Sequence, residues 1–285
     1  MATPKDSRFR ITVWPGDPVP EPRVGHHAPV ELHGDWLLYG LGLDSTRALP
    51  FDAYLHEVAD ADYEDRESLR SVTEQLGFFV HDFDNADRDM PPNCVGDRYN
   101  VQIARYCSLR GWAIPTDLAA ERSAVYSETH RPPAHIAEVS LRLQVLQRMG
   151  RHVISYASGS SLKDVWPEAK NDLAAWSAFG SWMNAATKAF HARVYLDFGE
   201  AASPTSGLWV SAYEVACLQI LNHLNIGAAY NECANSTCGR PFVRQRGRGE
   251  HYTRTEGVRY CSRPCANQQT QRDYRLRQKK NGGAT

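Results

Sequence analysis

Four of the seven cysteines lie in two closely spaced pairs near the C-terminus of the 285-residue chain. Cys233 and Cys238 form the first pair, and Cys261 and Cys265 form the second pair. A structural zinc ion takes four tetrahedral ligands, and four thiolates satisfy all four positions without leaving one for water. Two spaced pairs favour metal ligation over free or redox-active cysteines, because a large cytosolic chain rarely uses disulfides. The sequence therefore predicts one structural Zn²⁺ at these four residues.

The residues beside these cysteines suit a metal site. Asn235 and Gly239 are turn formers, which allow backbone amides to curl around a thiolate. Ser262 is a helix-capping residue type, and Pro264 is tolerated in a first helical turn. We therefore expect a basic helix that begins near Ser262 and carries Cys265 at its N-terminus, where the helix dipole favours the thiolate form.

Charge is divided unequally along the chain. The formal net charge is −1, yet residues 233–285 hold twelve basic and three acidic side chains, a net charge of +9. Residues 1–232 hold the other 20 basic and 30 acidic side chains, a net charge of −10. A basic segment attached to an acidic body indicates a polyanionic partner for the segment, and attraction to the chain's own acidic surface is the alternative.

Two clusters of cations in the basic segment are the candidate nucleic-acid contacts. A loop and one face of the expected helix supply them: Arg244, Arg246 and Arg248 in the loop, and Arg272, Arg275, Arg277 and Lys279 in the helix. Arginine binds phosphate through two parallel hydrogen bonds, and Gln268, Gln269 and Gln271 offer contacts to base edges. We expect DNA as the partner, with RNA as an alternative. A solvated helix that only maintains solubility is the other interpretation.

Catalysis and protein docking are the rival functions. The chain has no Gly-rich phosphate loop, no H-E-x-x-H motif and no G-x-S-x-G motif, and its eleven histidines show no metal-ligand pairing. A zinc-module nuclease would need a general base such as His251, which lies beside the arginine-rich loop. An adaptor whose zinc module docks an acidic protein is the third class. No catalytic residue is predicted.

The cysteine-rich segment resembles a known bacterial module. The run from Cys233 to Val243 reads Cys-x4-Cys-Gly-Arg-Pro-Phe-Val, and the run Tyr-Cys-Ser-Arg-Pro-Cys-Ala-Asn over residues 260–267 opens the basic helix. These runs are similar to the CGNR-type zinc finger of bacteria, over residues 233–280. The resemblance implies a treble-clef zinc module that follows a helical N-terminal domain, the ABATE domain, in a transcriptional regulator.

The expected fold class is mostly α, with a helical N-terminal domain and a small C-terminal treble-clef-like zinc module. We expect an irregular Pro- and Gly-rich arm over residues 1–30, a mainly helical domain over residues 31–230 and a zinc-binding basic module over residues 231–285. Local patterns predict a short strand at 35–39, helices at 69–79 and 176–190, a loop at 84–98, and a buried helix at 208–230 that leads directly into Cys233.

The strongest helical period lies at residues 135–153. Apolar side chains form a narrow stripe there, at Ile136, Val139, Leu143, Leu146 and Val153. Such a stripe would join two copies of the chain in a homodimer, or it would pack against another helix of the same copy. The residues leave both arrangements open.

Composition is typical of a globular protein. Hydrophobic residues make up 42% of the chain and charged residues 23%. Residues 1–10 are polar and charged, and no run approaches 18 uninterrupted apolar residues. We therefore expect a cytoplasmic protein with no membrane partner.

Overall fold

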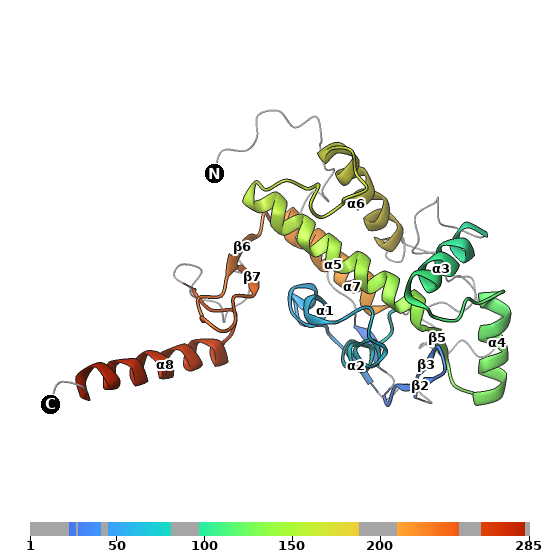
Figure 1. The fold of residues 1–285 in the computed structure, drawn as a ribbon, viewed down its shortest axis with the longest axis horizontal. Coiled ribbons are helices and arrows are strands. Elements are labelled where there is room, and N and C mark those ends of the chain that lie inside the picture. The colour runs from blue at the N-terminus through green and yellow to red at the C-terminus, as the bar shows by residue number, and fades with distance from the viewer. Residues whose placement is uncertain are drawn as a thin grey trace, which may run out of the picture. The chain divides into compact units, whose positions relative to one another are not determined.

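The structure is a computed structural model that describes residues 23–26, 28–40, 45–80, 97–187, 210–244 and 258–282 (Figure 1). The chain divides into two compact units, Met1–Asn222 and His223–Thr285. The described residues are mostly helical, as the sequence predicts, and the four paired cysteines lie together in the second unit. Among these residues, no helix is both long and apolar enough to cross a membrane.

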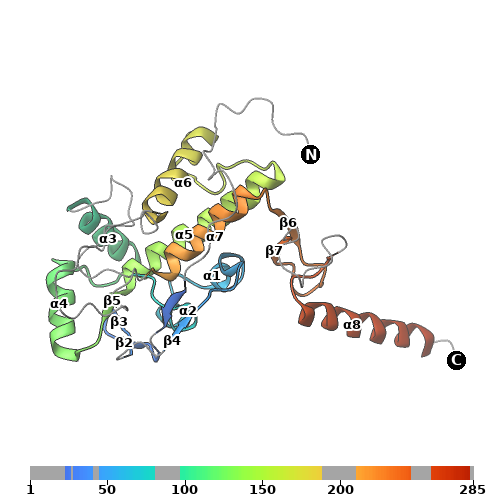
Figure 2. The same cartoon turned by 180° about the vertical axis from the view of Figure 1, so that it is seen from behind.

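A 23-residue helix, α5 (Ile136–Ser158), runs through the middle of the first unit. His135 caps its N-terminus by accepting a hydrogen bond from the Ala137 amide, and Gly159 ends it in the left-handed conformation. In Figures 1 and 2, α6 lies on one side of α5, while α1 and α2 lie on the other. Elements that pack against α5 include the 3₁₀ helix Ala53–Leu55, α1 (Glu57–Asp60), α2 (Arg66–Leu76), α3 (Asp97–Arg110) and α6 (Asp172–Thr187).

The predicted apolar stripe on α5 is buried in the first unit's own core. Its five side chains, Ile136, Val139, Leu143, Leu146 and Val153, are all 0% exposed. The stripe therefore packs within one copy of the chain, which is the intramolecular alternative. A homodimer through this helix stays a prediction, and it would have to use other side chains of α5.

Short strands join distant segments of the first unit. In one sheet, β3 (Trp36–Leu38) pairs with both β2 (Glu31–His33) and β5 (Pro133–His135), which directly precedes α5. The strand predicted at 35–39 is thus present as β3. In a second sheet, β1 (Val24–His26) pairs with β4 (Ser45–Arg47). Most of the irregular arm predicted over residues 1–30 lies outside the described residues; its described part contains β1, which pairs with β4, so the arm is not irregular there.

The helix predicted at 69–79 is α2, and it ends earlier than expected. Asp65 caps its start by accepting a hydrogen bond from the Ser68 amide at 2.8 Å. Gly77 ends it with a φ of +100°, a conformation that side chains rarely adopt, and a Cβ there would lie 2.6 Å from the Gly25 carbonyl oxygen. Close approach of β1 therefore requires glycine at the end of α2.

A buried carboxylate fixes the start of α5 against α4 (Leu118–Thr129). Glu138 accepts a hydrogen bond from the His135 amide, which completes the capping box, and it also forms an ion pair with Arg122 of α4. Glu138 is 1% exposed and Arg122 is 4% exposed. Removing one partner would leave the other charge buried, so the pair holds α4 in place.

The buried helix predicted at 208–230 is α7 (Ala212–Asn225), which is shorter. Ser211 and Glu214 form a reciprocal capping box at its start. After Gly227, with a φ of +57°, the chain enters β6 (Ala229–Glu232). The prediction that a helix leads directly into Cys233 was therefore wrong, because a strand precedes this cysteine.

The helix predicted at 176–190 is present as α6 up to Thr187, with residues 188–190 outside the described part of the chain, and its aromatic side chains pack around a histidine of α5. Phe179 is buried, Trp176 is half-buried, and both rings lie 4.4 Å from the ring of His152. The Nε1 of Trp166 donates a hydrogen bond to Nδ1 of His152 at 3.0 Å. His152 is 0% exposed, and burial lowers its pKa to about 4, although Asp172 partly opposes this shift. The aromatic face thus serves core packing around a neutral imidazole.

We predict that protonation of His152 destabilises the first unit in acid. The folded-state pKa of about 4 lies below the unfolded value of 6.5, so stability is lost as the pH falls from about 6.5 to 4. The loss attributable to this group grows through this range and reaches about 3 kcal/mol only below pH 4. His152→Gln keeps an acceptor for Trp166 and cannot titrate, so its free energy of unfolding should depend less steeply on pH. Urea unfolding of both proteins at several pH values measures this, and equal slopes would contradict the assignment.

Candidate metal centre

A hairpin in the second unit positions the first cysteine pair. Strand β6 pairs with β7 (Pro241–Arg244), and the Cys233 amide donates to the Arg240 carbonyl at 2.9 Å just beyond the paired residues. The turn between the strands closes through a hydrogen bond from the Cys238 amide to the Asn235 carbonyl at 2.8 Å. Gly239 adopts a φ of +61°, which returns the chain into β7. The cysteines therefore stand at the two ends of one tight loop.

The second pair lies at the start of α8 (Arg263–Gly282). Ser262 precedes this helix, and its side-chain oxygen accepts a hydrogen bond from the Cys265 amide at 3.4 Å, as expected of a capping residue. The segment before Cys261 is held against the first pair, because the Ala234 amide donates to the Arg259 carbonyl at 2.7 Å. The helix start and the hairpin loop are thereby brought together.

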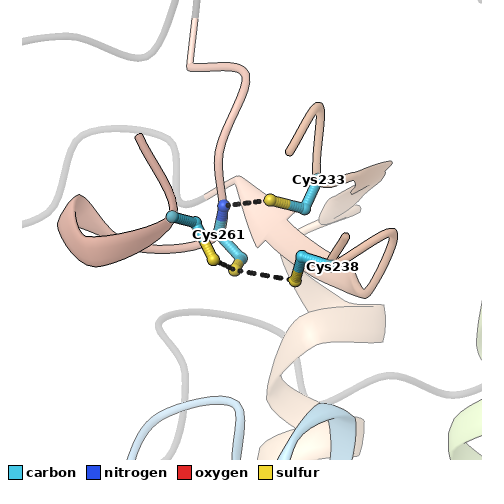
Figure 3. Close-up of side chains that lie close together, drawn as sticks. Cys233, Cys238 and Cys261 are labelled. Carbon is cyan, nitrogen blue, oxygen red and sulfur yellow. Dashed lines mark hydrogen bonds between the residues drawn. The ribbon is translucent and has the colours of Figure 1, made fainter. Parts of the chain in front are cut away.

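The four cysteine sulfur atoms converge. All lie within 4.8 Å of one another, and Figure 3 shows the side chains of Cys233, Cys238 and Cys261 pointing toward a common point. The Cys261 sulfur is 3.7 Å from that of Cys238 and 3.5 Å from that of Cys265. The Cys261 amide also donates to the Cys233 sulfur at 3.4 Å. The predicted set of four residues therefore forms one group with the geometry of a metal site.

Burial and crowding oppose ionisation of two of the four thiols when no cation is bound. Burial raises the pKa of the Cys238 thiol, and burial followed by the neighbouring thiols raises that of Cys261. Hydrogen bonding with Ser262 lowers the pKa of Cys265 to about 6, with a smaller effect from Asn235. Four thiolates this close repel one another, so the protein alone ionises only some of them. A divalent cation favours ionisation of the rest, because it binds the thiolate and not the thiol.

The predicted nucleic-acid contacts separate into three groups. Arg275, Arg277 and Lys279 are exposed on the second half of α8. Arg246 and Arg248 lie outside the described residues, as do the alternative general base His251 and most of the predicted loop at 84–98, while Arg244 ends β7 and its side chain is not described. Arg272 points to the first cysteine pair, with its guanidinium hydrogen-bonded to Asn235 and Thr237. Arg272 therefore differs from the other three helix cations, with which the sequence pattern grouped it, because its side chain contacts the cysteine loop and theirs are exposed.

Sequence reasoning missed the polar contacts between the hairpin loop and α8. Asn235 is 1% exposed and donates to Oε1 of Gln268 at 3.2 Å, and Oε1 of Gln269 accepts from the Ser236 amide at 3.1 Å. These two glutamines were expected to face base edges. The signal that identifies them is their spacing of three and four residues from Cys265, which places all three on one helix face.

Comparisons with protein-family models, with curated proteins and with solved structures found no match. Function is therefore inferred from the geometry of the site.

We predict about one metal ion per chain and a metal requirement confined to the second unit. Cys261→Ser should lower the metal content sharply and unfold α8 and the hairpin, because metal-binding energy contributes directly to folding of such a site. Elemental analysis and amide hydrogen exchange measure both effects. The amides of α5 are the internal control and should remain protected, since they belong to a separate core. A metal-free protein with a protected α8 would contradict this prediction.

Proposed function

We propose that the four-cysteine centre binds one structural zinc ion. A tetrahedron with Zn–S bonds of about 2.3 Å places its sulfur atoms ~3.8 Å apart. The separations of 3.7 and 3.5 Å at Cys261 come close to this value. Four cysteines leave no coordination position for water, so the ion has a structural role and not a catalytic one. A hairpin that carries one pair and a helix start that carries the other support the treble-clef layout implied by the resemblance to CGNR-type zinc fingers.

The small core of the second unit supports a structural role for the ion. Among its described residues, the buried apolar side chains are Cys233, Phe242 and Val243. So few residues bury too little apolar surface to offset the conformational entropy of a folded module. A metal bound by both cysteine pairs supplies the missing free energy.

The function that we propose for the zinc module is DNA binding, and the observation that carries it is the exposed stretch 274–279 in the second half of α8. Residues 274–279 are all exposed, and three of the six are the cations Arg275, Arg277 and Lys279. A helix of 20 residues spans about 30 Å, and a stretch without tertiary contacts is only marginally stable in water. Contact with the phosphates of a duplex would stabilise this stretch and neutralise its charge.

The whole chain is proposed to act as a transcriptional regulator. In this arrangement the acidic, helical first unit provides a separate core, and the basic second unit binds DNA. The division into two compact units and the net charges of −10 and +9 on residues 1–232 and 233–285 support it. The resemblance to CGNR-type proteins, in which a zinc module follows a helical domain, is the second support.

A protein-docking adaptor is the second candidate, and two side chains of α8 favour it. Tyr274 is 60% exposed and Leu276 is 58% exposed, so the basic stretch also presents apolar surface. An acidic protein partner would cover both kinds of side chain. Binding to DNA of any sequence at low salt separates the DNA-binding function from the adaptor.

We predict that the triple variant Arg275→Ala/Arg277→Ala/Lys279→Ala binds DNA more weakly. Each phosphate contact contributes a slope of about 0.9 to the dependence of log affinity on log salt, so the slope should fall by about two to three. Gel-shift titrations at several salt concentrations measure both quantities, and metal content should not change.

A matched control removes the same charge elsewhere. Arg151, Lys163 and Lys170 are exposed cations of the first unit, and their replacement by alanine should leave the salt slope unchanged. Equal loss of affinity in both triple variants would indicate an effect of net charge alone. Absence of salt-dependent binding to DNA by the wild-type protein would reject the DNA-binding function and favour the adaptor.

A further inference from the structure

Arg272 joins the two halves of the metal centre. Its Nη1 donates to Oδ1 of Asn235 and its Nη2 donates to Oγ1 of Thr237, both at 2.5 Å. These acceptors lie inside the loop between Cys233 and Cys238, 37 and 35 residues away from Arg272 in the sequence. A planar guanidinium offers parallel donors in a fixed fork, so one side chain binds two residues of the loop at once.

The contacts continue along the same face of α8. Cys265, Gln268, Gln269 and Arg272 follow one another at spacings of three, one and three residues, which places them together on the helix. Gln269 accepts from both the amide and the hydroxyl of Ser236, at 3.1 and 3.2 Å, and also from Arg272 at 3.3 Å. The face of α8 that carries Cys265 is therefore also the face that binds the loop between Cys233 and Cys238.

The loop itself is organised by the amide side chain that Arg272 binds. Oδ1 of Asn235 accepts hydrogen bonds from the amide and the hydroxyl of Thr237, at 3.3 and 3.2 Å. Asn235 is 1% exposed, so a loss of these partners leaves a buried polar group unsatisfied. Arg272 thus acts on the conformation that sets the directions of Cys233 and Cys238.

We propose that Arg272 is a positioning residue of the metal centre, which holds the Cys233–Cys238 loop against α8 at the separation that four-thiolate coordination requires. This inference rests on the proposed metal site and not on the proposed DNA binding. Hydrogen bonds around metal ligands change metal affinity by about 10- to 100-fold when removed. Its role differs from that of Arg275, one turn further along, which is exposed.

The test is a cobalt titration of the full-length chain, because tetrahedral Co²⁺–thiolate sites have a characteristic visible absorption. Arg272→Ala should weaken Co²⁺ and Zn²⁺ binding by about 10- to 100-fold and alter the absorption, whereas the matched variant Arg275→Ala should leave both unchanged. Alanine has the higher helix propensity, so a loss of helix does not explain the effect. Arg272→Lys should recover only part of the affinity, because an ammonium group lacks the planar fork.

A second variant removes only one of the two side-chain acceptors that Arg272 binds, Oγ1 of Thr237. Thr237→Val keeps the side-chain shape and should weaken metal binding less than Arg272→Ala does. The two changes should be less than additive in the double variant, because they remove the same hydrogen bond. Partial recovery by Arg272→Lys and this coupling support a positioning role.

Two negative outcomes have different meanings. Metal affinity in Arg272→Ala within about twofold of the wild-type value would overturn the assignment of Arg272 and leave the metal centre standing. No tetrahedral Co²⁺ absorption from the wild-type protein would overturn the metal centre and Arg272's role together. Neither outcome depends on whether the protein binds nucleic acid.

Discussion

Convergence of four sulfur atoms within 4.8 Å is the constraint on which the second unit depends. Like charges at this separation repel, and few apolar side chains are buried among the described residues of this unit, so a bound cation would favour the convergence. The hairpin, the capped start of α8 and the polar contacts between them all serve to deliver the sulfurs to one point. The core of the first unit is apolar, and α5 alone contributes several fully buried apolar side chains to it.

Hydrogen bonds between polar side chains hold the four-cysteine group together, whereas packing of apolar side chains holds the first unit together. Hydrogen bonds with defined directions join the loop to the helix. On the loop side they involve Asn235 and Ser236, and on the α8 side Gln268, Gln269 and Arg272. Such contacts specify one relative placement of loop and helix more narrowly than apolar packing does. The α8 side chains that make these contacts all lie in the first ten residues of the helix. These contacts therefore do not involve the exposed residues 274–279.

Sequence patterns correctly predicted the elements that depend on interactions between residues close together in the sequence. The apolar period on α5 and the two cysteine pairs identified a helix and a group of four neighbouring cysteines that could hold a metal ion, because spacing alone determines which side chains share a face or a loop. Long-range pairing explains the failures. Strand β1 is ordered by β4, about 20 residues away, and α7 gives way to β6 because pairing with β7 replaces the helix at Ala229. The contacts of Arg272 were hidden for the same reason, since its acceptors are more than 30 residues away.

The division of α8 into an anchored half and an exposed half has a kinetic consequence. The side chains at 274–279 are exposed, so opening of this stretch costs less free energy than opening of the anchored half. An opened basic segment samples a larger volume than a rigid helix, and cations on it are attracted to a polyanion before the segment is aligned. Under the proposed function, the same residues therefore raise the rate of encounter with DNA first and complete their helix on its surface afterwards.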